Sequence, residues 1–201
     1  MDSTMWDARY STDELVWKAD PNRFLVEEVR DLVPGRALDV ACGEGRNAMW
    51  LAESGWDATG VDFSAVGLDK ARSITAQRGV EVEWIKSDVV TWEPPIAAFD
   101  LILVAYLQLP EDQRRHVHRA LVAGIAPGGT LLVVAHDSTN LIEGVGGPQS
   151  PHVLFSPDDV LHDVGGLGLE IVRAERVLRP VDTPQGPRNA IDALVRLARP
   201  R

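Results

Sequence analysis

Short apolar segments alternate with segments of helical periodicity through the first two thirds of the chain, and this alternation limits the possible folds more than any other feature. The apolar segments have the length of buried strands and cover residues 37–41, 57–62, 80–85, 99–106 and 130–135. The expected helices cover residues 21–33, 46–54, 64–79 and 110–125. Strands that alternate with helices predict a parallel sheet with helices on both faces. We therefore expect a Rossmann-like, doubly wound α/β fold.

The last third of the chain departs from this alternation. Residues 137–157 are rich in Gly, Pro, Ser and Asn, and we expect a long loop there, near the acceptor site. Residues 167–178 and 191–198 have the pattern of strands, and a turn-rich linker, residues 179–188, separates them without a helix. Successive strands of this kind pair antiparallel. The expected sheet is therefore mostly parallel and seven-stranded, with an antiparallel terminal strand pair.

Two helix starts can be read from capping signals. Asp20 followed by Pro21 has the pattern of an N-cap and a first helical residue. Ser156 followed by Asp159 has the pattern of a capping box.

Length and charge exclude several classes of protein. The chain has 201 residues, which suits a single domain over residues 1–201, and its net charge is −10. Without a basic run we expect neither nucleic acid nor a membrane surface as a partner. Cys42 is the single cysteine, which suits a reducing compartment, and there is no signal peptide or membrane span in the sequence. We therefore expect a cytoplasmic protein; its oligomeric state stays open.

A glycine loop follows the first expected strand. Gly43 and Gly45 can adopt positive φ and bring bare backbone close to a ligand, at the sheet edge where α/β folds bind ligands. Together with Ala48 they also match the loose dinucleotide pattern G-x-G-x-x-A. Ordinary turn geometry is a further explanation of such glycines.

Three acidic residues narrow the choice of ligand. Asp39 lies inside the first strand, Asp62 ends the second strand, and Asp88 follows the third. Asp39 would repel a pyrophosphate and attract a cationic group. Asp62 is placed to accept hydrogen bonds from ribose hydroxyls, and Asp88 from an adenine amino group. The three acids favour a ligand with an amine, a ribose and an adenine, and without phosphate.

Five segments, taken in order, resemble the motifs of the class I S-adenosylmethionine-dependent methyltransferases, from about Arg36 to the end of the chain. They lie at residues 38–45, 61–64, 87–89, 99–105 and 121–132. The resemblance implies S-adenosylmethionine as the cofactor and methyl transfer as the reaction. Residues 105–108, Ala-Tyr-Leu-Gln, depart from an Asn-Pro-Pro-Tyr run, which counts against methylation of nucleobase or protein amino groups.

A narrower resemblance is carried by residues 6–10, Trp-Asp-Ala-Arg-Tyr, and by residues 42–47. They are similar to the tellurite-resistance and thiopurine methyltransferase-like branch. That resemblance implies that residues 1–20 form an aromatic lid over the cofactor, although Trp6, Tyr10 and Trp17 also suit simple core packing. It further implies small acceptors: thiols, chalcogen oxyanions or small aromatic hydroxyls.

The family's motifs also imply a set of cofactor-binding residues. They hold the amino-acid end, the ribose and the adenine of the cofactor, and they are Trp6, Tyr10, Asp39, Ala41, Gly43, Gly45, Arg46, Asp62, Phe63, Asp88, Val89, Ala105 and Tyr106.

Catalytic residues are expected where the fourth and fifth strands end, at the edge that faces the acceptor. A soft acceptor that is already ionised needs no base, whereas a hydroxyl needs one. His136 is a candidate general base, and Tyr106 is a second candidate catalytic residue. A polar residue that merely closes a strand is an equal explanation of His136. His116 and His118 are expected at the surface, and no metal site is expected.

Two rival functions remain open at this point. A nicotinamide-dependent oxidoreductase would explain the dinucleotide pattern, although Asp39 and the terminal strand pair oppose it. A non-catalytic protein that binds the cofactor or a partner would keep the glycine loop without turnover.

Overall fold

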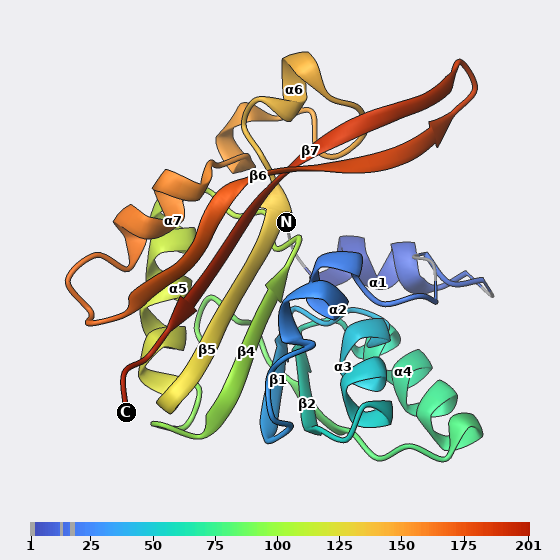
Figure 1. Ribbon diagram of the computed structural model, residues 1–201. Coiled ribbons are helices and arrows are strands. Elements are labelled where there is room, and N and C mark those ends of the chain that lie inside the picture. Colours follow the sequence, from blue (N-terminus) through green and yellow to red (C-terminus); the bar gives the residue numbers. More distant parts are fainter. Residues whose placement is uncertain (1–2, 13, 17–18) are drawn as a thin grey trace.

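The computed structural model describes residues 3–12, 14–16 and 19–201 of the chain. A seven-stranded sheet has the order β3-β2-β1-β4-β5-β7-β6 (Figure 1). Its strands are β1 (Arg36–Val40), β2 (Asp57–Asp62), β3 (Glu83–Lys86), β4 (Phe99–Ala105), β5 (Ile125–His136), β6 (Glu170–Thr183) and β7 (Gly186–Ala198). The helices are α1 (Ser3–Tyr10), α2 (Arg23–Val29), α3 (Arg46–Glu53), α4 (Ala65–Arg78), α5 (Glu111–Gly124), α6 (Asn140–Glu143) and α7 (Pro157–Asp163), with a 3₁₀ turn at Pro151–Val153.

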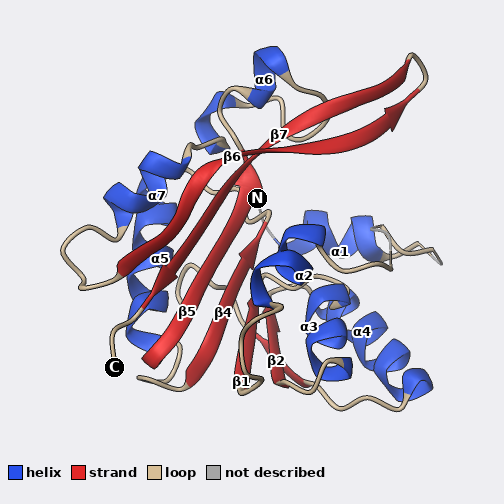
Figure 2. Ribbon diagram, viewed as in Figure 1, coloured by secondary structure: helices blue, strands red, loops and turns tan. Residues whose placement is uncertain are grey.

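The pairing of the strands confirms the expected fold class. β1 to β5 pair in parallel, whereas β7 pairs antiparallel with both β5 and β6. Helices α5 and α7 lie on one side of the sheet, and α2 and α3 lie on the other (Figure 2). Two buried apolar clusters fill these two layers, one around Ile102 and Val133 and the other around Leu101 and Leu132. Alternate residues of β4 and β5 thus point to opposite faces of the sheet.

The terminal hairpin is longer than the sequence suggested. The prediction of a turn-rich linker at residues 179–188 was wrong, because Arg179 to Thr183 continue β6 and Gly186 to Arg188 belong to β7. Pro180 and Pro187 lie in these extensions. β6 is the last strand of the sheet, and β7 pairs with β5 only from residue 192 onward, so both prolines lie where their strand has a free edge and a missing N–H costs nothing. The hairpin extends past the sheet at the end where β5 stops (Figure 1).

The first helix of the sheet region begins later than expected. Its N-cap is Asn22 and not Asp20, because the Asn22 side chain accepts hydrogen bonds from the backbone N–H groups of Phe24 and Leu25. The helix also stops at Val29, and Val33 is exposed. The capping box at Ser156 and Asp159 is confirmed.

The expected surface position of His118 was wrong, whereas His116 is exposed as expected. His118 is 1% exposed, and its Nδ1 lies 2.9 Å from Oδ2 of Asp163. Arg114 donates to both oxygens of the same carboxylate, at 2.7 and 3.2 Å. This buried cluster joins α5 to α7, since a buried charge is tolerated when it is paired and hydrogen-bonded.

Candidate functional site

Two non-glycine residues with positive φ mark one edge of the sheet. Ala41 follows β1 with φ 55°, and Tyr106 follows β4 with φ 60°. β1 and β4 are parallel neighbours, with Val40 paired to Val104, so both residues lie at the same carboxyl edge. Residues that carry a side chain are strained in this backbone conformation, and such strain concentrates at functional sites. The edge is also the usual place for ligands in open α/β sheets.

The glycine loop between β1 and α3 has two different reasons for its glycines. Gly43 has φ 56°, and a Cβ there would lie 2.6 Å from the hydroxyl of Tyr10. Gly45 has φ 79°, and a Cβ there would collide with the ring of Trp84 from β3. Packing beneath the loop therefore explains Gly45, whereas Gly43 lies under the N-terminal helix.

Asp39 and Asp62 are brought together behind this loop, as the sequence predicted. They are 1% and 3% exposed, and the charge of Asp62 adds to the effect of burial in raising the pKa of Asp39. Burial raises the pKa of Asp39 to about 7, against the opposing effects of the Ala48 N–H and Arg46. Burial also raises the pKa of Asp62, whose oxygens accept backbone N–H bonds from Gly43 and Ser64 at 2.8 Å.

Charges at the loop are not neutralised by direct pairs. Among the described residues, neither Asp39 nor Asp62 forms an ion pair, and the same holds for Arg46, the first residue of α3. Burial lowers the pKa of Arg46. Two buried carboxylates and one cation beside a bare backbone loop fit a ligand that carries both charges. S-adenosylmethionine has an ammonium, a sulfonium and a carboxylate, so this donor set fits it, whereas a pyrophosphate would be repelled by the carboxylates.

The expected adenine side of the site lies at the ends of β2 and β3. The backbone N–H of Ser87 donates to the carbonyl of Asp62 at 2.9 Å, which joins the two strand ends. Asp88 is exposed, and its carboxylate accepts the N–H of Val90 at 2.9 Å in a local turn. Phe63 is half-buried, and Val89 packs against the core. The structure brings these residues to the expected edge, and Asp88 keeps acceptor capacity toward solvent.

The N-terminal segment lies against the glycine loop. Tyr10 is 4% exposed, and its ring stacks on that of Trp6 with centroids 5.4 Å apart. The Ser64 hydroxyl donates to Asp7 at 2.5 Å. The contact agrees with either a lid or core packing, the two explanations weighed from the sequence. Trp17 lies outside the described residues.

Glu44, between the two loop glycines, is a residue that sequence reasoning missed. Its buried carboxylate accepts the N–H of Val16 at 3.0 Å and pairs with Lys70 at the same distance. The only available signal was an acid inside a glycine loop, which usually implies a solvated side chain. Glu44 thereby fastens the N-terminal segment to the loop.

The two candidate catalytic residues meet at the ends of β4 and β5. The rings of Tyr106 and His136 have centroids 4.8 Å apart. The Tyr106 hydroxyl donates to Oδ2 of Asp192 at 2.8 Å, and Nδ1 of His136 lies 3.3 Å from Oδ1 of the same carboxylate. Arg179 donates to Asp192 at 2.7 Å and lies over the Tyr106 ring. This group of Tyr106, His136, Arg179 and Asp192 is called the acceptor cluster below.

Electrostatics inside the acceptor cluster differ from residue to residue. Burial alone would raise the pKa of Asp192, but His136, Arg179 and Tyr106 together hold it below its usual value. Burial and the Asp192 charge raise the pKa of Tyr106 well above its usual value. Tyr106 therefore stays protonated and serves as a donor, not as a base. Asp192 and Arg179 were not identified from the sequence, because Asp192 reads as one polar residue in an apolar strand.

The glycine-rich loop after β5 covers the acceptor cluster. Gly147 has φ 75°, and a Cβ there would lie 2.8 to 3.0 Å from the His136 ring. Gln108 accepts the backbone N–H of His136 at 2.8 Å and donates to the carbonyl of Val153. Asp137 is buried and pairs with Arg176 at 2.9 Å. The loop is therefore fastened directly beside His136, and its position near the acceptor stays a prediction.

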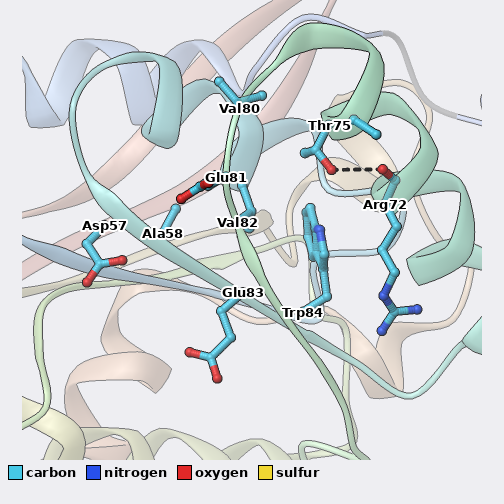
Figure 3. Close-up of a pocket in the computed structure, with 10 residues that line it drawn as sticks. Asp57, Ala58, Arg72, Thr75, Val80, Glu81, Val82, Glu83 and Trp84 are labelled. Carbon is cyan, nitrogen blue, oxygen red and sulfur yellow. Dashed lines mark hydrogen bonds between the residues drawn. The ribbon is translucent and has the colours of Figure 1, made fainter.

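A hollow of about 600 Å³ lies elsewhere, between α4 and the starts of β2 and β3 (Figure 3). Asp57 and Glu83, the first residues of those strands, line it together with Arg72 and Trp84. It opens at the amino ends of the strands, opposite the glycine loop. Because it lies away from the glycine loop and from the acceptor cluster, we do not place the functional site there.

Two further properties limit the chemistry of the part of the chain that the structure describes. Within residues 3–12, 14–16 and 19–201, no cluster of three or more His, Cys, Asp or Glu side chains could hold a metal ion. No helix in those ranges is long and apolar enough to cross a membrane.

Residues 37–129 match the family model described as a methyltransferase domain. The chain is 33% identical over 122 residues to a trans-aconitate 2-methyltransferase of Rhodopseudomonas palustris, covering 60% of this chain and 46% of that protein. It is 29% identical over 120 residues to a 2-heptyl-1-hydroxyquinolin-4(1H)-one methyltransferase of Mycobacteroides abscessus, covering 58% and 53%. The chain thus spans about half the length of these curated relatives. Residues 37–129 are therefore similar to a methyltransferase domain, and the curated relatives named here are methyltransferases.

Solved structures of similar fold include the N-methyltransferase NodS of Bradyrhizobium japonicum in complex with S-adenosyl-L-homocysteine. Its TM-score is 0.74 at 21% identity, covering 99% of this chain and 98% of that one. TehB from Haemophilus influenzae has a TM-score of 0.71 at 19% identity, covering 99% and 67%. At these identities the likeness concerns the fold alone, so the narrower tellurite-resistance or thiopurine branch stays a prediction.

Proposed function

We propose that this chain, whose residues 37–129 match a methyltransferase domain, transfers a methyl group from S-adenosylmethionine to a small-molecule acceptor. The observation that carries the proposal is the placement of Asp39, Asp62 and Arg46 around a bare glycine loop, with the acceptor cluster at the same sheet edge. When bound, the cofactor supplies an electrophilic methyl group. Catalysis then requires alignment of the acceptor and exclusion of water.

Each part of the site has a role in this proposal. Asp39 attracts the cationic amino-acid end of the cofactor, Arg46 its carboxylate, and Asp62 its ribose. Residues 1–20 form a lid of which Trp6 and Tyr10 contact the cofactor, and residues 137–157 border the acceptor. Phe63, Asp88 and Val89 hold the adenine, and Ala41, Ala105 and Tyr106 lie under the methionine portion. The whole chain, residues 1–201, acts as one domain.

Thiols, chalcogen oxyanions and small aromatic hydroxyls are the acceptor classes that we propose to test. The relatives named for trans-aconitate and for a hydroxyquinolone add a carboxylate and an N-hydroxyl compound to the panel. The test measures S-adenosylhomocysteine release from S-adenosylmethionine with one acceptor of each class. Release that depends on an acceptor supports the proposal. If the protein binds the cofactor but releases no S-adenosylhomocysteine with any of the acceptors, this would contradict small-molecule transfer and favour the non-catalytic binding protein.

A further inference from the structure

Asp192 faces His136 directly across two paired strands. In the antiparallel ladder between β5 and β7, His136 and Asp192 are register partners. Residues opposite each other in such a ladder have side chains on the same face, within reach of one another. The His136 and Asp192 side chains are 14% and 0% exposed. Their contact is thus set by backbone pairing and does not depend on a flexible surface side chain.

The two nitrogens of His136 have different surroundings. Nδ1 is buried and lies 3.3 Å from Oδ1 of Asp192, at an angle outside that of a good hydrogen bond. Nε2 has no hydrogen-bond partner among the residues that the structure describes. A carboxylate at Nδ1 favours the tautomer that carries its proton there, because the partner of one ring nitrogen decides which nitrogen is protonated. The lone pair on Nε2 is then available to take a proton.

The remaining charged groups around His136 are already paired. Arg179 and Tyr106 both donate to Asp192, and Asp137, the next residue along β5, pairs with Arg176. Tyr106 donates its hydroxyl proton to Asp192, and the Asp192 carboxylate already accepts from Tyr106 and Arg179. His136 is therefore the member of the acceptor cluster that is left to act as a base. Arg179 has no free charge to offer an anionic acceptor. An acceptor that arrives as a thiolate or an oxyanion would find neither an unpaired cation in this cluster nor a use for a base.

From this arrangement we propose that Asp192 is a positioning residue that holds His136 as general base, and that the acceptor class is a small molecule with a hydroxyl group protonated at neutral pH. The inference rests on the proposed methyl-transfer function. The acceptor O–H bond breaks, its electron pair stays on oxygen to form the new O–CH₃ bond, and the proton moves to Nε2 of His136. The resulting imidazolium is stabilised by Asp192. The methyl group comes from the cofactor, which leaves as the thioether.

Phenol and thiophenol form a matched pair of probes, because they share a ring but only thiophenol is largely ionised at neutral pH. In assays with S-adenosylmethionine we expect His136→Gln and Asp192→Asn to lower kcat/KM for phenol by on the order of 100-fold. We expect thiophenol transfer to change by less than about threefold, since it needs no base. Asp100→Asn, at the opposite edge of the sheet, is the control and should leave both rates unchanged.

Two kinetic outcomes would overturn the proposal: an equal loss on both probes, which would show a purely structural role, or wild-type transfer to thiophenol without any to phenol. Titration with S-adenosylhomocysteine separates this failure from failure of the proposed function. A protein that does not bind it fails as a methyltransferase, whereas one that binds it normally and shows either kinetic outcome fails only in the assignment of the base and the acceptor.

The tautomer of His136 tests the same inference without any acceptor. Long-range ¹H–¹⁵N spectra of the labelled full chain distinguish the two neutral tautomers, and His136→Gln identifies the His136 signals among the five histidines. We expect the Nδ1–H tautomer in the wild type and a shift toward Nε2–H in Asp192→Asn. The exposed His116 and His152 should not change between the two proteins. An Nε2–H tautomer in the wild type would overturn the proposal, because no lone pair would face the acceptor.

Discussion

The hydroxyl of Tyr10 lies over the backbone of Gly43, so close that a Cβ at Gly43 would be 2.6 Å from it. The N-terminal helix α1 is therefore in contact with the loop that we propose to hold the cofactor. The contact connects two parts of the chain that were identified separately in the sequence, the aromatic segment and the glycine loop. It also makes Gly43 a position where a single methyl group tests their relationship.

Gly43→Ala should displace Tyr10 and weaken cofactor binding by at least tenfold. The control is Gly79→Ala, because Gly79 has a similar φ of 67° but no atom within 4 Å of an added Cβ. Both variants should lose about 1–2 kcal/mol of unfolding free energy from the left-handed backbone. Urea unfolding and calorimetry with S-adenosylhomocysteine provide the two readouts. Equal affinities in the two variants would show that the Tyr10 contact is irrelevant to binding.

Asp39→Asn should make the protein more stable and weaken its binding of the cofactor. Because burial raises the pKa of Asp39 to about 7, the folded state holds a proton that the unfolded state has already lost. Ionised Asp39 therefore costs stability, and this cost grows as the pH rises from about 4 to about 7. We expect Asp39→Asn to be more stable than the wild type at pH 8, by on the order of 1–3 kcal/mol, and equally stable near pH 4.

The same variant should bind S-adenosylmethionine more weakly at pH 8, since it lacks the charge that attracts the cationic end. Asp100→Asn is a control of opposite sign, because Arg36 holds the pKa of Asp100 below its usual value. That variant should lose a little stability at neutral pH and keep its affinity. Thermal melts across this pH range, together with calorimetry, decide the matter; unchanged affinity in Asp39→Asn would remove Asp39 from the cofactor site.

Removal of residues 1–19 tests whether the N-terminal segment is a lid. The truncated chain keeps Asn22, whose backbone N–H donates to Asn47 at 2.9 Å and whose side chain caps α2. The rest of the fold should therefore survive, with a circular dichroism spectrum that loses only the contribution of α1. We expect weaker cofactor binding or slower transfer. Wild-type affinity and rate after truncation would show that Trp6 and Tyr10 serve only in packing.

Asp163→Asn tests whether the buried cluster of Arg114, His118 and Asp163, between α5 and α7, has a structural role. The change leaves Arg114 and His118 without their carboxylate, and breaking a buried pair in this way costs about 3–5 kcal/mol. His118 and Arg114 hold the pKa of Asp163 below its usual value although burial opposes them, so its stabilising contribution is lost in the wild type as the pH falls below about 4. Denaturant unfolding should show a larger difference between the two proteins at pH 7 than at pH 3.

Much of the fold could be predicted because its signals are local. The strand at residues 57–62 and the helix capped by Ser64 depend on periodicity and capping within a few residues. The hairpin was misjudged because a proline breaks a strand only where its N–H is needed. Whether Pro187 has a free edge depends on where β7 pairs with β5, which no local pattern records.

The candidate site likewise contains some residues that local sequence patterns predict and others that only the fold brings together. Asp39 and Asp62 lie near the ends of β1 and β2, and Gly43 follows β1, in a recognisable motif that the structure brings together. Asp192 is 56 positions from His136 in the sequence, and only the register of β5 and β7 makes them neighbours. Glu44 was missed for a related reason, since its partner Val16 is positioned by an N-terminal segment without a strong pattern of its own.

Calorimetry of the purified protein with S-adenosylmethionine, S-adenosylhomocysteine and NADH tests the central claim most directly. The account predicts micromolar binding of the two sulfur compounds and none of NADH, because the site offers carboxylates where a pyrophosphate would have to lie. Absence of binding by both sulfur compounds would contradict the account. Binding of NADH in their place would favour a nicotinamide-dependent oxidoreductase.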